Sequence, residues 1–256
     1  MMISKKVVVI GAGAAGLMAG ATAALYGASV TIIEKNKRVG RKIMITGKGR
    51  CNLANNCDVQ TFINNVPVNG RFLYSAINAF TPEDTIEFFE SKGLKTKTER
   101  GNRVFPASDK SVDVVDTMHD YAVESGCKIV CDTANALILE DGAVIGVKCE
   151  ENTYYADSVI ICCGGKSYPL TGSTGDGYTL AKQAGHTIIP LKPSLVPFTS
   201  GDKQCKDMQG LALKNVALRI VDKNSKKTVY SDFGEMLFYT FRNERSDDFI
   251  GKLAHP

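Results

Sequence analysis

The stretch Val7-Val8-Val9-Ile10-Gly11-Ala12-Gly13-Ala14-Ala15-Gly16 decides the fold of this 256-residue chain. Its four β-branched residues predict a buried parallel strand. The glycines that follow have separate physical roles. Gly11 allows a tight turn, Gly13 lets backbone approach a pyrophosphate, and Gly16 lets the next helix pack close to the strand. The pattern therefore predicts a Rossmann-like βαβ unit, with phosphates at the N-terminus of its helix.

The residues after this loop follow the order that a dinucleotide-binding fold requires. Residues 17–26 predict an alanine-rich helix that stops at Gly27, and residues 29–33 predict a second strand. Glu34 ends that strand, where a carboxylate can accept hydrogen bonds from a ribose 2′-hydroxyl and disfavours the 2′-phosphate of NADP. The alternative is a glycine-rich turn without a ligand. We expect a dinucleotide site, and its residues here are Gly11, Gly13, Ala14, Ala15, Gly16 and Glu34.

The first motif alone does not show whether the dinucleotide is FAD or NAD. A second glycine-spaced and basic stretch, residues 39–52, distinguishes between these two cofactors. A simple dehydrogenase would normally continue with another βα unit here. Flexible backbone and cations instead suit a longer cofactor with further phosphate and ring contacts. The alternative is a solvated basic loop. We favour FAD.

Composition bounds the class of protein. The net charge is +4, with 31 basic and 27 acidic residues, which is too mild to predict a nucleic-acid partner. The eight cysteines and three histidines lack zinc spacing, and the longest apolar runs are too short for a membrane span. Residues 1–6 lead into the first strand without an apolar leader. We expect a cytoplasmic protein with free thiols, a small-molecule substrate and no membrane or nucleic-acid partner; the oligomeric state stays undetermined.

Further elements alternate between helices and strands, as an α/β fold requires. Asp141-Gly142 predicts a hairpin turn. Gly164-Gly165 follows a buried strand, where glycines suit a close backbone approach. Met118 is expected in the core and His119 on the surface. Helices are predicted at residues 81–91, 111–125 and at 176–184 with Asp176 as its cap, and strands at 94–105 (paired), 128–131, 136–140, 143–149, 157–162 and 187–190.

Pro190, Pro193 and Pro197 mark a change of composition. We predict a Rossmann-like domain over residues 1–190. Residues 195–238 alternate like short antiparallel strands, and we assign residues 191–238 to the beginning of a second, β-rich domain.

At several motifs the chain resembles a bacterial flavoprotein family, the BaiN type, which includes aminoacetone-oxidase-like and bile-acid Δ4,6-reductase-like proteins. The resemblance covers about residues 5–238. The most specific motif is Thr46-Gly47-Lys48-Gly49-Arg50-Cys51-Asn52, although the family more often has glycine at position 48. The other matching stretches are the Gly11–Gly16 loop with Glu34, Gly40-Arg41-Lys42, Arg103-Val104-Phe105-Pro106, Cys163-Gly164-Gly165-Lys166-Ser167-Tyr168-Pro169, Thr174-Gly175-Asp176-Gly177-Tyr178, Ala181 and Gly185-His186.

The resemblance implies a glutathione-reductase-type FAD domain with an inserted substrate domain. It implies hydride transfer through the flavin N5, with NAD(P)H as a transient donor and an enone such as a steroid or bile-acid intermediate as one substrate option. Oxidation of a small amine by oxygen is another. It places Ala134 near the adenine, and Arg50, Cys51 and Asn52 near the flavin. The remaining cofactor contacts implied in this way are Lys35, Arg41, Lys42, Thr46, Gly47, Gly49, Cys163, Gly164 and Gly165.

The last residues depart from the family, which continues Thr-His-Phe-Gly-x-Ser-Gly-Pro after Phe238. This chain has Tyr239-Thr240-Phe241-Arg242-Asn243-Glu244-Arg245-Ser246 instead. Codons for those residues can be chosen so that dropping one nucleotide restores the family motif. We therefore hypothesise a frameshifted tail at 239–256 and a truncated second domain, and an inactive fragment is an alternative to an active oxidoreductase. A gene sequence whose shifted frame cannot encode the motif would exclude this hypothesis.

Rival functions remain open. A non-enzymatic flavin-binding redox module predicts bound flavin without turnover, and a plain NAD-dependent dehydrogenase predicts nicotinamide binding without flavin. A flavin-dependent RNA-modifying enzyme requires a basic stripe with exposed aromatic residues, which the sequence does not indicate. No catalytic set emerges. Cys51 is a weak candidate for a redox thiol, since a buried packing cysteine is the more usual role. A Cys162–Cys163 disulfide is not expected.

Overall fold

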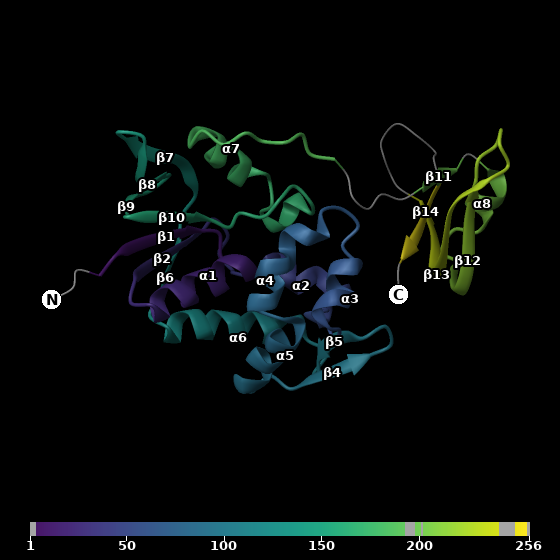
Figure 1. The fold of residues 1–256 in the computed structure, drawn as a ribbon, viewed down its shortest axis with the longest axis horizontal. Helices are drawn as coiled ribbons and strands as arrows, with labels where there is room; N and C mark the ends of the chain where they lie inside the picture. The colour runs from purple at the N-terminus through teal and green to yellow at the C-terminus, as the bar shows by residue number, and fades with distance from the viewer. Residues whose placement is uncertain (1–3, 193–197, 201, 241–248, 255–256) are drawn as a thin grey trace. The chain divides into compact units, whose positions relative to one another are not determined.

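The computed structural model describes residues 4–192, 198–200, 202–240 and 249–254. The chain divides into two compact units, Met1–Ile189 and Pro190–Pro256, and each is described by itself. The division lies beside Pro190, where the sequence predicts a change of domain. Figure 1 shows the elements of both units in chain order.

The first unit is built on a four-stranded parallel sheet in the order β10-β1-β2-β6. Because all four strands run in the same direction, their carboxyl ends meet along one edge, where ligands of open α/β sheets bind. The predicted strands at this sheet are confirmed to within two residues at each end. The strands are β1 (Lys6–Ile10), β2 (Ser29–Glu34), β6 (Lys128–Cys131) and β10 (Ser158–Ile161).

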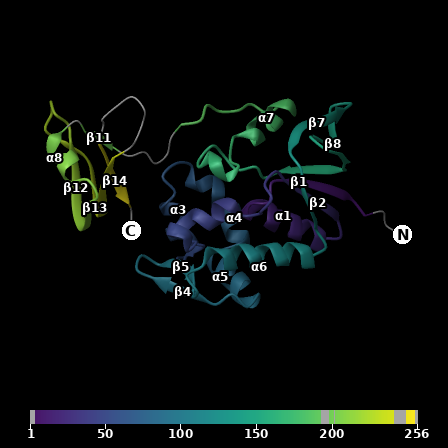
Figure 2. The same ribbon diagram turned by 180° about the vertical axis from the view of Figure 1, so that it is seen from behind.

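Both faces of this sheet are covered, as a continuous apolar strand requires. Val9 packs into a core cluster with Leu17 and Met118 from two helices, α1 (Ala14–Leu25) and α6 (Ser111–Glu124). These helices lie along each other below the sheet in Figure 1 and, seen from behind, in Figure 2. Val8 points to the other face and packs with Val147.

That second face is covered by a three-stranded antiparallel sheet and by α7 (Asp176–Gln183). Asp141 and Gly142 both have positive φ, +48° and +78°, which confirms the predicted hairpin turn. The third strand of this sheet was not predicted, because it is only three residues long. The strands are β7 (Ala134–Glu140), β8 (Ala143–Cys149) and β9 (Thr153–Tyr155).

The segment between β2 and α6 is mostly helical. Thr81 confirms the predicted helix start: its side chain accepts from the Asp84 N–H at 3.0 Å, and the Asp84 carboxylate accepts from the Thr81 N–H at 2.7 Å. A small antiparallel sheet in the order β3-β5-β4 closes this part. The elements between β2 and α6 are α2 (Arg41–Ile45), the 3₁₀ turn η1 (Thr46–Gly49), β3 (Ala54–Asn55), α3 (Val59–Asn64), η2 (Gly70–Leu73), α4 (Tyr74–Ala79), α5 (Pro82–Ser91), β4 (Thr96–Glu99) and β5 (Arg103–Pro106).

Two predictions near the end of this unit were wrong. Gly175 is the cap of α7, and Asp176 is its first helical residue, because the Asp176 carboxylate is held by Lys35 and Thr174. Residues 187–190 form no strand, since they pair with no neighbouring strand of the described chain. The short 3₁₀ turn η3 (Pro169–Thr171) precedes α7.

The second unit contains an antiparallel sheet in the order β11-β14-β13-β12. The sequence predicts short antiparallel strands for 195–238, and this range contains one short strand, one short helix and two long strands joined by a turn. Residues 195–197 and 201 lie outside the described residues. Strand β13 continues past Phe238, and β14 pairs with it, so part of the 239–256 segment belongs to this sheet. Its elements are β11 (Phe198–Ser200), α8 (Lys203–Asp207), β12 (Ala212–Val221), β13 (Thr228–Thr240) and β14 (Phe249–Ala254).

Candidate functional site: a dinucleotide-sized cavity

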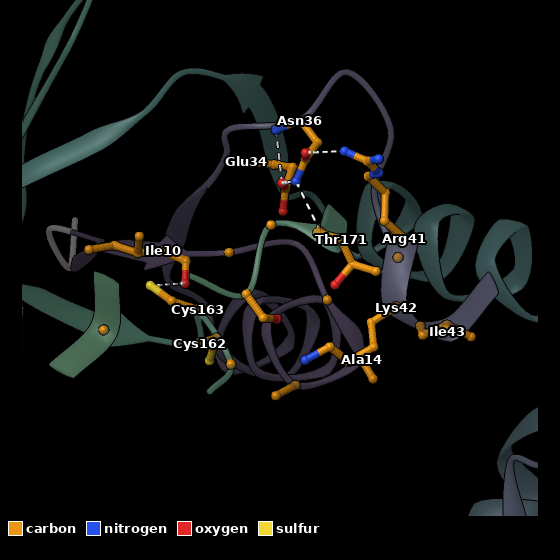
Figure 3. Close-up of a pocket in the computed structure, with 18 of the residues that line it drawn as sticks. Ile10, Ala14, Glu34, Asn36, Arg41, Lys42, Ile43, Cys162, Cys163 and Thr171 are labelled. Atoms are coloured by element: carbon orange, nitrogen blue, oxygen red, sulfur yellow. Dashed lines mark hydrogen bonds between the residues drawn. The ribbon is translucent and has the colours of Figure 1, made fainter. Parts of the chain in front are cut away.

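A cavity of about 1030 Å³ opens at the carboxyl edge of the parallel sheet. The ends of β1, β2 and β10, the start of α1, and the segments that follow β2 and β10 form its wall (Figure 3). The volume is at the upper end of ligand sites in proteins, which suits an extended ligand.

The glycine loop has space for a side chain at Gly13 and none at Gly11 or Gly16. A Cβ on Gly11 would come within 2.6 Å of the Cys162 carbonyl oxygen, and one on Gly16 within 1.8 Å of the Gly11 carbonyl oxygen. A Cβ on Gly13, at the N-cap of α1, would meet no heavy atom within 4 Å. Open space therefore adjoins the start of α1, whose first N–H groups have no acceptor within the helix, and this arrangement fits a diphosphate. Ala14 and Ala15 complete this wall.

Glu34 is buried at the end of β2 and lines the cavity. Its Oε2 accepts from the Ala12 N–H at 2.8 Å, and its Oε1 accepts from the backbone and side-chain nitrogens of Asn36 at 2.9 and 2.5 Å. These donors fix the carboxylate beside the glycine loop. Sequence reasoning missed Asn36, because its role depends on the direction in which the chain leaves β2.

Basic side chains enclose the cavity on the other side of the loop. Arg41 and Lys42 begin α2 and line it, and Lys42 Nζ lies 3.4 Å from Ser167 Oγ. Lys35 also lines it, but its Nζ is 2.6 Å from Asp176 Oδ2. Within the described part of the chain, Arg41 and Lys42 are therefore the cations of this wall that form no ion pair with a carboxylate.

The Thr46–Asn52 turn contributes only part of its predicted contacts. Thr46, Cys51 and Asn52 line the cavity, whereas Gly47 and Gly49 do not. Cys51 is buried and has φ +60°, and burial raises the pKa of its thiol above the ordinary value. The thiol is thus neutral near pH 7, a state that does not favour a redox role.

Arg50, which the resemblance places near the flavin, is not among the residues that line the cavity. Its guanidinium bonds Glu99 at 2.8 Å and Asp109 at 3.0 Å, and it stacks 4.0 Å from the centroid of the Phe105 ring. Three partners hold the side chain against β4 and β5. Gly16 and Gly165 also lie outside the wall: Gly16 serves helix packing, and a Cβ on Gly165 would come 3.3 Å from the Tyr178 hydroxyl.

Ala134, Cys163 and Gly164, which the resemblance implies as cofactor contacts, line the cavity. Asp132 was missed. It is buried and accepts hydrogen bonds from the backbone N–H groups of Thr133, Glu151 and Asn152, which lowers the pKa of its carboxyl below the ordinary value despite burial.

Side chains of the core cluster that contains Leu17 and Met118 give the cavity an apolar wall, which the sequence did not indicate. Met118, predicted as a core residue, is buried and also lines the cavity. The signal was hidden, because a side chain facing a cavity and one facing the core share the same helical spacing. The apolar lining residues here are Met18, Ile43, Leu53, Phe89, Val114 and Met118.

All eight cysteines are free thiols, as expected, so Cys162 and Cys163 form no disulfide. The described part of the chain has no cluster of ligands that could hold a metal ion. None of the helices within it has both the length and the hydropathy of a membrane span.

The parallel sheet, the glycine loop and the acid that ends the second strand define a Rossmann-type dinucleotide-binding protein. Residues 5–240 match the family model described as "HI0933-like protein Rossmann domain". The chain belongs to this family, which confirms the resemblance found in the sequence.

Two curated relatives have different names. The chain is 35% identical over 191 residues to a 3-dehydro-bile acid delta(4,6)-reductase of Clostridium scindens, covering 73% of this chain and 46% of the relative. It is 29% identical over 236 residues to a ribosomal RNA dihydrouridine synthase of Escherichia coli K12, covering 92% and 57%. The chain thus spans about half the length of the curated relatives it matches.

A solved structure supports the fold alone. The 3-ketosteroid-delta4-(5alpha)-dehydrogenase of Rhodococcus jostii RHA1 is 14% identical, with a TM-score of 0.50 over 72% of this chain and 54% of that chain.

Proposed function

We propose that the chain binds FAD and belongs to an FAD-dependent oxidoreductase. The observation that carries the proposal is the open space at Gly13, at the start of α1, beside a fixed Glu34 carboxylate in a cavity that also has an apolar wall. A diphosphate, a ribose and a large flat ring would each meet a matching wall. When bound, the flavin supplies an N5 atom that accepts and passes on a hydride.

The residues of this chain would bind and shield the cofactor. The N–H groups at Gly13, Ala14 and Ala15 would hold the diphosphate, and Glu34 the ribose that carries adenine, with Ala134 on the adenine side. Thr46, Cys51 and Asn52 lie along the cavity toward Leu53 and the apolar wall, which would exclude water from the ring.

We propose the reduction of a carbon–carbon double bond conjugated to a carbonyl group. The names of both curated relatives describe the saturation of such a bond, in a bile acid or in uridine. In the net reaction, NAD(P)H gives a hydride to one carbon, a solvent proton adds to the other, and NAD(P)⁺ leaves. No second glycine fingerprint is present in the sequence, so the nicotinamide would bind transiently.

A small apolar enone is the substrate class that we favour, because the relative named for a bile acid is 35% identical to this chain and the relative named for ribosomal RNA is 29% identical. An RNA uridine is the second candidate, because the E. coli relative matches 92% of this chain. The test supplies the purified chain anaerobically with FAD, NADH or NADPH, and either a 3-oxo-Δ4 steroid or uridine-containing ribosomal RNA. Saturation of the steroid alone supports the first candidate, and saturation of uridine alone supports the second. Bound flavin without turnover of either would favour the non-enzymatic module or an inactive fragment.

A further inference from the structure

One amide side chain, that of Asn36, links two charged groups on the wall of the cavity. Its Nδ2 donates to Glu34 Oε1 at 2.5 Å, and its Oδ1 accepts from Arg41 Nη1 at 2.6 Å. Figure 3 shows the amide between the carboxylate and the guanidinium. Glu34, Asn36 and Arg41 all line the same cavity.

The chemistry of the two neighbours fixes the orientation of this amide. A carboxylate only accepts hydrogen bonds and a guanidinium only donates them, so the residue between them must offer one donor and one acceptor. Aspartate at position 36 would set a second negative charge against Glu34. Alanine would leave Arg41 without its acceptor.

The segment before α7, at Thr171 and Gly172, packs against the same amide. A Cβ on Gly172 would come within 2.6 Å of Asn36 Nδ2, and that nitrogen lies 3.5 Å from the Thr171 carbonyl oxygen. Asn36 is thus held on a third side, and its side chain has a defined place in the wall.

We propose that Asn36 is a positioning residue that sets Arg41 for the diphosphate of the bound dinucleotide. Arg41 is exposed and long, so a fixed acceptor removes rotamer freedom that would otherwise be lost on binding. Its remaining N–H groups stay available for phosphate oxygens, which a guanidinium binds in pairs. Glu34 keeps two backbone donors without the Asn36 side chain, so the effect of truncating Asn36 falls on Arg41.

The inference rests on the proposed cofactor class, but it requires only a ligand with a ribose and a diphosphate. The test is calorimetric titration of the full flavin-free chain with ADP and with adenosine, which lacks phosphate. Asn36→Ala is expected to lower the affinity for ADP about tenfold and the affinity for adenosine less than about threefold. Arg41→Ala is expected to weaken ADP to a similar extent. The double variant is expected to match Arg41→Ala within about twofold, because Asn36 acts through Arg41.

Asn36→Asp separates the two sides of the amide. Because the new carboxylate would repel that of Glu34, Asn36→Asp is expected to lower the affinity for adenosine as well as for ADP. Circular dichroism and melting temperature show whether each variant is folded; Arg41 is exposed, so Arg41→Ala keeps the test open if Asn36→Ala unfolds.

Three results overturn the inference: ADP affinity unchanged in Arg41→Ala, equal loss of ADP and adenosine in Asn36→Ala, or additive losses in the double variant. A wild-type chain that binds no ADP overturns it as well. A chain that binds ADP with the expected variant pattern but binds no FAD refutes the proposed function and leaves this inference standing.

Discussion

Gly13 and Gly16 lie three residues apart in one motif, yet the structure gives them different roles. A side chain at Gly16 would meet backbone, which cannot move aside, whereas a side chain at Gly13 would project into open cavity. Glycine is therefore required by the fold at position 16, whereas at position 13 the fold leaves room that the proposed ligand would use.

This difference predicts opposite outcomes for one substitution. Gly16→Ala is expected to lower the free energy of unfolding by about 3 kcal/mol or more, because the added methyl overlaps a carbonyl oxygen. Gly13→Ala is expected to change it by less than about 1 kcal/mol and to weaken ADP binding about tenfold or more. Chemical denaturation and calorimetry measure the two effects. Equal loss of stability in both variants would contradict the separation of the two roles.

Cys51 is expected to behave as a buried neutral thiol. Because its pKa is raised by burial, the thiolate form is scarce at pH 7 and increases only at pH values above the ordinary thiol range. Iodoacetamide should label the exposed Cys131 at least about tenfold faster than Cys51 at about pH 7.5, as mass spectrometry would show.

Cys51→Ser extends that test to turnover. The variant should bind FAD and turn over the proposed substrate as the unaltered chain does. Loss of turnover with the flavin still bound would instead make Cys51 a catalytic residue.

Among the elements, β4 and β5 are joined to the turn after α2 by a group of charges around Arg50. Lys97 Nζ lies 2.5 Å from Asp109 Oδ2, and Arg50 bonds both Asp109 and Glu99. Hydrogen bonds from these cations lower the pKa of the Glu99 and Asp109 carboxyls below their ordinary values of 4.5 and 3.8.

The sign of these shifts gives a pH dependence. Carboxyls with a lower pKa in the folded state stabilise the fold above their ordinary pKa values, and this contribution disappears as pH falls through the folded values. Arg50→Ala should therefore lower the melting temperature at about pH 7 and have little effect near pH 2. Arg103→Ala is a matched control, since Arg103 also lies over Phe105 but donates to a backbone carbonyl. A deficit that is equal at both pH values would contradict the role of the carboxylates.

Elements with local signals were predictable, and contacts that depend on distant segments were not. The loop after β1, the Thr81 cap and the Asp141-Gly142 turn are each determined by a few adjacent residues. The partners of Arg50 could not be predicted, because they lie 49 and 59 residues further along the chain. The strand predicted at 187–190 failed for a related reason: a strand needs a partner, and sequence alternation does not supply one.

At the scale of the whole molecule, every residue that lines the cavity lies between Ile10 and Ala181, within the first unit. The described core clusters of that unit are also complete without residues 190–256. A chain that ends at Ile189 is therefore expected to fold and to bind ADP within about twofold of the full chain. Calorimetry compares the two chains. A loss of about tenfold or more would show that the second unit contributes to the site.

The measurement that tests the flavoprotein assignment most directly is the visible absorption spectrum of the purified chain after gel filtration, followed by titration with FAD if the chain is colourless. We expect flavin bands that elute with the protein, or saturable FAD binding that Gly13→Ala weakens. A chain that is folded, binds ADP or NAD, and neither retains nor binds FAD would contradict the assignment.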